Sequence, residues 1–271
     1  MLTLLRKIRR SVIDSATTKK LSSPFLRYSV YAIGEIVLVV IGILIALQIN
    51  NWNIDRINRI QEKSYLKRIV KDLESDLFDL SVAIRSNDDR LLRGVWLLES
   101  LERDIDEIKS RESYLKAKAN LPNFDQFEGK SFGKVLTDFR MFNTFNENVN
   151  TFQEIIANGK SDIIRDEELK ITIQSHYSSI LEKKWLQNIV EKERDTYIEY
   201  LVSNGISNLN TFSVEEILSR INNKEVFYAQ IENYLLIASE VQKGLRDDED
   251  SIENTTEILI KRIKAYLADK Y

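Results

Sequence analysis

Hydrophobic residues recur at alternating steps of four and three along the stretch from Leu66 to Ile108. This heptad spacing places them on one narrow face of a helix and leaves the charged residues on the other faces. Asn87 and Gly94 interrupt the stripe, and residues 86–89 offer N-cap chemistry, so the pattern allows a break into two helices there. The stripe consists of Leu66, Val70, Leu73, Leu77, Leu80, Ile84, Leu91, Leu98, Leu101, Ile105 and Ile108. A stripe this long either pairs in a coiled coil or forms one wall of a helical bundle.

Two more long helical stretches follow and favour the bundle. Residues 120–133 hold one of the two prolines and two of the eight glycines and are predicted to form the main loop. No segment shows a convincing alternation with a period of two. Residues 50–271 are therefore predicted to be all-α, with long antiparallel helices. The predicted helices of this part begin near Lys134 and cover about 166–202, 214–220 and 224–268.

The ends of these helices carry recognisable signals. Asn204-Gly205 is typical of a helix C-terminus. Ser213 followed by Glu216 predicts a capping box at the start of the short helix.

A different pattern stands near the N-terminus, where Glu35 is the only formal charge between Tyr28 and Ile54. At about 1.5 Å per residue, a helix over residues 28–49 is about 33 Å long, enough to cross a hydrocarbon core of about 30 Å. A buried helix of a soluble core would need fewer apolar residues and would keep a polar stripe. A cleavable signal peptide would need a small-residue cleavage site, which the sequence lacks after this run. Residues 28–49 are therefore predicted to be a transmembrane helix.

Residues 1–27 form a basic tail with a local net charge of +6. Leu4, Leu5, Ile8 and Val12 fall on one helical face, so residues 2–13 are predicted to lie along a lipid surface. Basic tails favour the cytoplasmic side, while long domains translocate largely regardless of charge. We therefore expect the N-terminus in the cytoplasm and residues 50–271 as an extracytoplasmic domain.

The residues of the predicted span also carry a resemblance. Residues 31–36 read YAIGEI and residues 41–53 read IGILIALQINNWN, preceded by LRKIR at residues 5–9. This pattern resembles the N-terminal signature of an uncharacterised family of single-span membrane proteins of Gram-negative bacteria. The resemblance implies an inner-membrane anchor and a periplasmic domain. It covers about 50 residues of the 271 and implies no activity, ligand or catalytic residue.

Composition limits the chemistry that this chain can perform. The chain has 39 basic and 42 acidic residues, a net charge of −3, no Cys and a single His. Absence of Cys excludes disulfides, thiol catalysis and cysteine-ligated metals. The charge balance gives no reason to expect nucleic acid as a partner. No nucleophile–base pair or metal set can be assembled from these residues, so no catalytic, cofactor or metal site is predicted and no enzyme is expected.

Three short motifs imitate functional sites, and each has a simpler interpretation. His176 is predicted to be a structural residue within a helix. Gly129-Lys130-Ser131 resembles the end of a phosphate-binding loop, but Phe124 stands where the first glycine of that motif belongs. The run from Asp247 to Asp250 is interpreted as a solvated helix face, because consecutive acids on a helix point in different directions.

Glu35 is the most informative residue of the predicted span, since a carboxylate inside a membrane is costly. Gly42 and Ala46 fall on the same helical face and form a small-xxx-small pair that lets two helices approach closely. We therefore predict a helix–helix interface at Glu35, Gly42 and Ala46. The alternative is a glutamate near the membrane interface that extends to the headgroups without a function.

Phenylalanines concentrate between residues 124 and 152. Their simplest role is to form core at the junction of loop and bundle. The alternative is an apolar docking or ligand surface, for which the candidates are Phe124, Phe127, Phe132, Phe139, Phe142 and Phe145.

Three functions are compatible with this organisation. The leading hypothesis is a membrane-anchored scaffold or interaction protein without catalytic activity, with the lipid bilayer and either a second copy or another membrane protein as partners. The second is a ligand-sensing or regulatory subunit of an envelope complex. The third is an ion-coupled subunit that uses Glu35.

Overall fold

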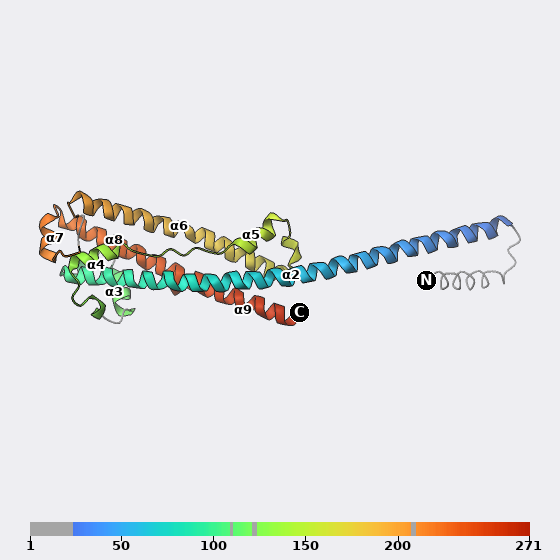
Figure 1. Ribbon diagram of the computed structural model, residues 1–271, viewed down its shortest axis with the longest axis horizontal. Helices are drawn as coiled ribbons and strands as arrows, with labels where there is room; N and C mark the ends of the chain where they lie inside the picture. Colours follow the sequence, from blue (N-terminus) through green and yellow to red (C-terminus); the bar gives the residue numbers. More distant parts are fainter. Residues whose placement is uncertain (1–23, 109–110, 121–123, 207–209) are drawn as a thin grey trace. The chain divides into compact units, whose positions relative to one another are not determined.

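The computed structural model describes residues 24–108, 111–120, 124–206 and 210–271, and these residues form helices without any strand (Figure 1). Helical content and the absence of strands in the described ranges confirm the all-α prediction. The α-helices are α2 (Pro24–Ser100), α3 (Arg111–Asn120), α4 (Phe132–Phe139), α5 (Asn150–Ala157), α6 (Glu167–Ser203), α7 (Val214–Arg220), α8 (Lys224–Gln242) and α9 (Ile252–Lys270). Short 3-10 turns cover Ile105–Glu107, Asp125–Phe127 and Ser161–Ile163, and a π-helical turn covers Lys243–Asp247.

The chain divides into two compact units, Met1–Ile60 and Gln61–Tyr271. In the described part of the first unit, α2 is long and apolar enough to cross a membrane, and its most apolar window has no buried residue. The predicted surface-lying helix at residues 2–13 lies outside the described residues.

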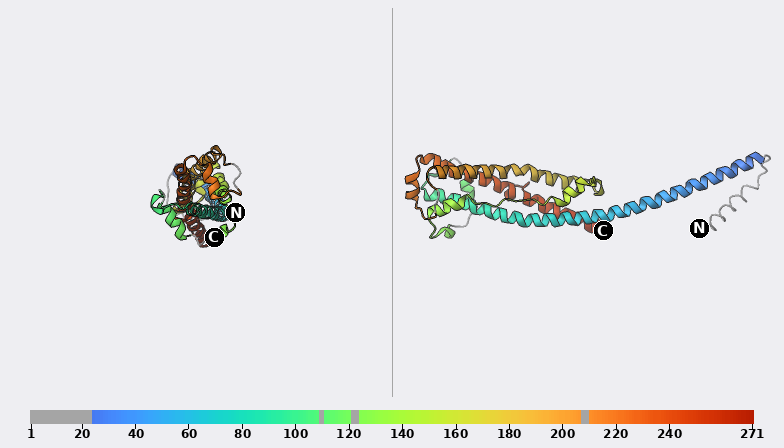
Figure 2. Two further views of the ribbon diagram at one scale, coloured as in Figure 1. Left: turned by 90° about the vertical axis from the view of Figure 1, so that its left-hand side faces the viewer. Right: turned by 45° about the horizontal axis from the view of Figure 1, so that its top comes forward.

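The second unit is a bundle in which the C-terminal half of α2 packs with α6, α8 and α9 (Figures 1 and 2). Its core has three successive clusters along α2. The first joins residues 66–73 of α2 to the start of α6 and to α9. The second joins residues 80–84 to the turn between α8 and α9. The third joins residues 91–101 to α4, the end of α6, α7 and α8. This packing places the stripe in an intramolecular bundle.

The order of these clusters also gives the directions of the helices. Helices α2 and α6 run the same way, whereas α8 and α9 run against both. This arrangement requires the chain to return between α4 and α5, which it does through residues 141–149 without regular structure. Side chains of α2 hold the returning segment: Ser86 Oγ accepts the N–H of Asn143 at 2.9 Å, and Asp76 Oδ1 accepts the N–H of Asn148 at 2.7 Å.

The stripe runs along α2 without a break from Leu66 to Leu98, whereas its last three predicted positions, Leu101, Ile105 and Ile108, lie beyond the end of α2 at Ser100. Helix α2 continues through residues 86–89, so no second helix begins there. Asn87 is 2% exposed and donates to Ala238 O at 2.9 Å, which satisfies the polar side chain within the core. At Gly94 an added Cβ would lie 2.9 Å from both Leu235 and Phe139. The glycine therefore allows α2 to approach α8 and α4 closely.

Two predicted helix ends, the C-terminus of α6 and the N-terminus of α7, agree with the structure. Gly205 follows the C-cap residue Asn204 of α6 and has φ +70°. Residues with a Cβ adopt this backbone conformation only with strain. Ser213 and Glu216 form the predicted capping box of α7.

The last predicted helix requires a correction, because residues 224–268 form two helices rather than one. Helix α8 ends at Gln242, a π-helical turn follows, and Ser251 caps α9 by accepting the N–H of Asn254. Of the acidic residues 247–250, Asp247 ends the π-helical turn, and the other three lie in the connection that follows it; all four are exposed. Ser251 is fully buried, and its cap interrupts the helix at a point that the apolar spacing alone does not reveal.

Candidate functional site

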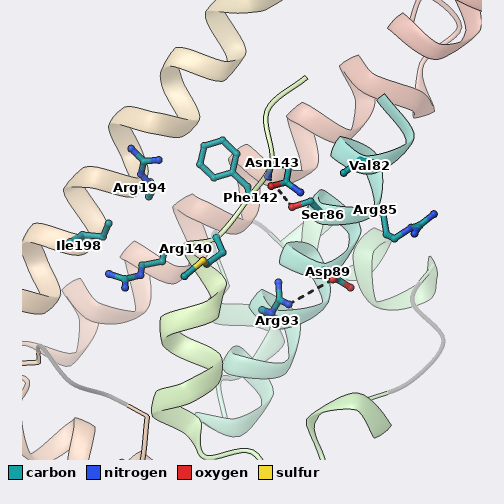
Figure 3. Close-up of a pocket in the computed structure, with 11 residues that line it drawn as sticks. Val82, Arg85, Ser86, Asp89, Arg93, Arg140, Phe142, Asn143, Arg194 and Ile198 are labelled. Carbon is teal, nitrogen blue, oxygen red and sulfur yellow. Dashed lines mark hydrogen bonds and ion pairs between the residues drawn. The ribbon is translucent and has the colours of Figure 1, made fainter. Parts of the chain in front are cut away.

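A surface cleft of about 630 Å³ lies between α2, the residues that follow α4, and α6 (Figure 3). Its volume falls within the range of about 300–1,000 Å³ typical of ligand sites. The lining residues are Val82, Arg85, Ser86, Asp89, Arg93, Arg140, Met141, Phe142, Asn143, Arg194 and Ile198.

Local periodicity explains how each helix contributes to the cleft. The contributing residues of α2 are spaced by one, three or four, which places them along one side of the helix. Arg194 and Ile198 are likewise one turn apart on α6. Arg140 is the C-cap residue of α4, and its carbonyl accepts the hydroxyl of Tyr234 at 3.3 Å, which holds the start of the returning segment.

The cleft is basic, with four arginines against one aspartate. Arg93 pairs with Asp89 at 3.7 Å, and Arg194 pairs with its neighbour Asp195 at 2.9 Å. Arg85 and Arg140 form no ion pair within the described ranges. In Figure 3 Arg85 extends away from Arg140 and Arg194, so we regard Arg93, Arg140 and Arg194 as the centre of the cleft. Guanidinium groups with unused donors are suited to carboxylate or phosphate oxygens.

Phe142 separates the cleft from a polar group in the core. The guanidinium of Arg194 lies 5.6 Å from the centre of its ring, and that of Arg90 lies 5.1 Å away. Arg90 also lies 5.2 Å from the ring centre of Tyr234. Such distances are typical of cation–π contacts, which stabilise arginine where water is scarce. Burial lowers the pKa of Arg90, although a guanidinium remains charged near neutral pH.

A second buried charge on α2 is fully satisfied by the protein. Glu62 is 0% exposed. Its Oε1 accepts the backbone N–H of Arg165 and the hydroxyl of Tyr266, both at 2.9 Å, while Oε2 accepts the hydroxyl of Tyr271 at 2.5 Å. Burial, followed by the hydrogen bond to Glu62, raises the pKa of Tyr266 to about 12. This group joins α2 to Tyr266 of α9, to the C-cap residue Tyr271 and to Arg165, which stands two residues before α6.

The predicted phenylalanine surface is divided by the structure. Phe127, Phe132, Phe139 and Phe145 are 4% exposed or less and lie in the core. Phe124 is partly buried against the same core. Phe142 is the member of the set that lines the cleft.

Glu35, Gly42 and Ala46 all lie on exposed surface of α2 in the first unit. A Cβ added at Gly42 would have no atom within 4 Å. Their proximity to a second helix stays a prediction, since a single chain does not test it.

Two of the three imitating motifs occupy structural positions. His176 is 6% exposed, and its ring packs edge to face against Tyr177 with 5.5 Å between the ring centres. Burial lowers the pKa of its imidazole to about 4. Ser131 caps α4 by accepting the N–H of Lys134 at 3.2 Å. Within the described ranges no three His, Asp or Glu residues converge as metal ligands.

Sequence reasoning did not identify the arginine cleft. Arg93, Arg140 and Arg194 come from three separate segments and no local motif connects them. The one local signal is Arg90, which stands among apolar residues in the run RLLRGVW and close to the buried stripe.

The fold and the cleft define a class: a helical bundle that carries a basic cleft and follows one helix apolar enough to span a membrane. The chain belongs to the family of unknown function DUF6090, whose model matches residues 35–228. This range contains the candidate interface residues of α2 and every residue that lines the cleft. No curated protein and no solved structure matches the chain.

Proposed function

We propose that this protein is a membrane-anchored interaction protein that binds an acidic segment of a partner protein in the cleft around Arg93, Arg140 and Arg194. The observation that carries the proposal is a cleft of about 630 Å³ with four arginines and a single carboxylate among its lining residues.

Charge complementarity supports an acidic partner. Residues 1–27 carry +6 and Glu35 carries −1 of the total net charge of −3, so the rest of the chain carries −8. A basic cleft on an acidic bundle attracts carboxylates locally while the remaining surface repels other acidic proteins. Met141, 57% exposed, and Val82, 39% exposed, add apolar surface beside the arginines.

The anchor supports a fixed location for this interaction. Residues 28–49 span the membrane, the basic tail stays in the cytoplasm and the bundle lies in the periplasm of a bacterial envelope. The bilayer is thus the first partner, and the bundle acts without catalysis.

Photo-crosslinking in living cells tests the proposal. A photoreactive residue at Ile198 lies in the cleft, whereas one at Leu181, 55% exposed on the same helix, is the matched control outside it. We expect a discrete adduct at residue 198 that decreases at least about fivefold in the double variant Arg140→Gln/Arg194→Gln, because each bond to a charged group contributes about 1.5–3 kcal/mol. Protease added to spheroplasts should digest this adduct.

Arg68→Gln is the control for a general loss of positive charge, since Arg68 pairs with Glu154 outside the cleft. Equal adducts at both positions, or an adduct indifferent to the arginines, would contradict the docking site. Full protection from external protease would contradict the topology.

A second candidate function, self-association through the span, is favoured by the open surface at Gly42. Because nothing lies within 4 Å of its added Cβ, Gly42→Leu causes no clash within one chain and reports on association alone. We expect it to weaken dimerisation in a bacterial two-hybrid assay, and Glu35→Gln to weaken it less, since an amide still bonds across helices. Val40→Leu places added bulk on the opposite face and should leave dimerisation unchanged. Equal dimerisation of all variants would remove this interface.

A further inference from the structure

Arg90 is a buried cation whose donors are largely unused. Its side chain is 1% exposed, and Nη2 donates to Asn87 Oδ1. Nε and Nη1 are buried without a hydrogen-bond partner. An unpaired buried charge costs several kcal/mol, so proteins normally pair it with an opposite charge.

The neighbouring carboxylate does not supply that charge. Asp88 accepts from Gln242 Nε2 at 2.8 Å and pairs with Arg246 at 3.1 Å. Asn87 completes the connection by donating to Gln242 Oε1 at 2.6 Å. The amides of Asn87 and Gln242 therefore separate Arg90 from Asp88, and no carboxylate pairs with Arg90 in the described part of the chain.

A small cavity lies beside Arg90. Its volume is about 30 Å³, and its polar lining consists of Asn87, Arg90, Asn143 and Thr144. A cavity needs about 10–15 Å³ to hold one water molecule, so this one has room for about two waters or one small ion, and no room for an organic ligand. Water would satisfy N–H donors but would leave the charge of Arg90 uncompensated.

We propose that this cavity binds a monovalent inorganic anion of the size of chloride, held by the unused Nε–H and Nη1–H donors of Arg90. The anion neutralises the guanidinium, and the polar groups of Asn143 and Thr144 share the cavity with it. The proposal does not depend on which partner occupies the outer cleft.

The site has a consequence for that cleft, because Phe142 and Asn143 line both spaces. Figure 3 shows these two residues side by side on the returning segment, with Asn143 bonded to Ser86. An anion behind Phe142 therefore stabilises the segment that forms one wall of the cleft.

The test measures thermal unfolding of the full-length chain in a neutral detergent while chloride replaces gluconate at constant ionic strength. Gluconate is too large for the cavity. With a Kd of about 10 mM, the wild-type Tm should rise by about 4–8 °C between about 1 and 300 mM chloride. The rise should be small below the Kd and should continue by a constant amount for each tenfold increase in chloride above it. Line broadening of ³⁵Cl in nuclear magnetic resonance should report the same binding directly.

Arg90→Met keeps side-chain volume and removes the charge, so both the chloride-dependent rise and the broadening should disappear. In Arg90→Lys the Tm should still rise with chloride, but by less than in wild type, because the positive charge remains while the donor geometry differs. Arg68→Met, an exposed arginine on the same helix, should behave as wild type.

A wild-type Tm that is the same in chloride and gluconate would show that the cavity holds water only and would overturn the proposal. So would a chloride response that persists in Arg90→Met. If Arg90→Met does not fold, an anomalous bromide peak beside Arg90 in wild-type crystals decides between the two results.

Discussion

Glu62 and Arg90 are buried charged residues on the same helix, and the protein treats them differently. The carboxylate of Glu62 accepts three hydrogen bonds of 2.9 Å or less from the backbone and from two tyrosines. The guanidinium of Arg90 has one hydrogen-bond partner, two aromatic faces and two nitrogens without partners. The protein itself thus satisfies the carboxylate of Glu62, whereas it leaves donors of Arg90 available for a bound anion.

This contrast separates a structural charge from a candidate binding site. Burial alone does not distinguish them, since both side chains are 1% exposed or less. Unused donors beside a cavity do distinguish the two residues. A buried charge with a structural role is normally hydrogen-bonded to nearby groups of the protein, as Glu62 is.

Glu62→Gln should have the largest effect on stability. The amide removes the charge that three donors share and places its own NH₂ among them, so we expect a loss of about 3 kcal/mol. Arg90→Met at low chloride should instead stabilise the fold by about 1–2 kcal/mol, because it removes a buried charge that has no opposite charge as partner. Chemical unfolding of both variants in the same detergent measures the contrast. Equal losses would show that Arg90 is as structural as Glu62.

Asp76 offers an intermediate case, a buried carboxylate with one oxygen bonded to Asn148 and the other without a partner. Burial, opposed by the bond from Asn148 and reinforced by nearby acids, raises its pKa from 3.8 to about 6. The folded state therefore binds this proton more tightly than the unfolded state, and the resulting stability is lost as pH rises from about 4 to 6.

Asp76→Asn removes the titration and keeps the acceptor for Asn148. We expect the variant to be more stable than wild type by about 2 kcal/mol at pH 8 and to lose this advantage near pH 4. His176 has the opposite dependence, since its lowered pKa makes acid destabilise the fold between about pH 6.5 and 4. Because both proteins contain His176, its contribution cancels in the difference between their unfolding curves. A difference that does not vary with pH would contradict the raised pKa.

Tyr271→Phe should have the smallest effect. It removes one of the three bonds to Glu62 from a residue that is 39% exposed, so water can replace the hydroxyl. We expect a loss of about 1 kcal/mol in the same unfolding assay. The loss should disappear in the Glu62→Gln background if the two side chains act as one unit. Additive losses would show that the Tyr271 hydroxyl stabilises the bundle independently of Glu62.

Local patterns predicted most of the secondary structure correctly. Heptad spacing, the capping box at Ser213 and the glycine after α6 each depend on residues within a few positions of one another, and such interactions form wherever the segment is placed. The apolar run of residues 28–49 is equally local, since its length and composition suffice for a helix that could span a membrane. The same reasoning failed at residues 243–251, where a buried serine cap outweighs the apolar spacing.

Local patterns in the sequence suffice for an all-α chain with an apolar N-terminal helix, whereas the packing of distant segments brings its charged residues together. Arg93, Arg140 and Arg194 share a cleft because the returning segment lets α2 and α6 run in the same direction, and no nearby residue encodes that path. The cavity beside Arg90 likewise exists only where α2, α6, the end of α8 with its π-helical turn, and the returning segment pack around one another. Contacts between residues this far apart depend on how whole helices pack, which local periodicity does not specify.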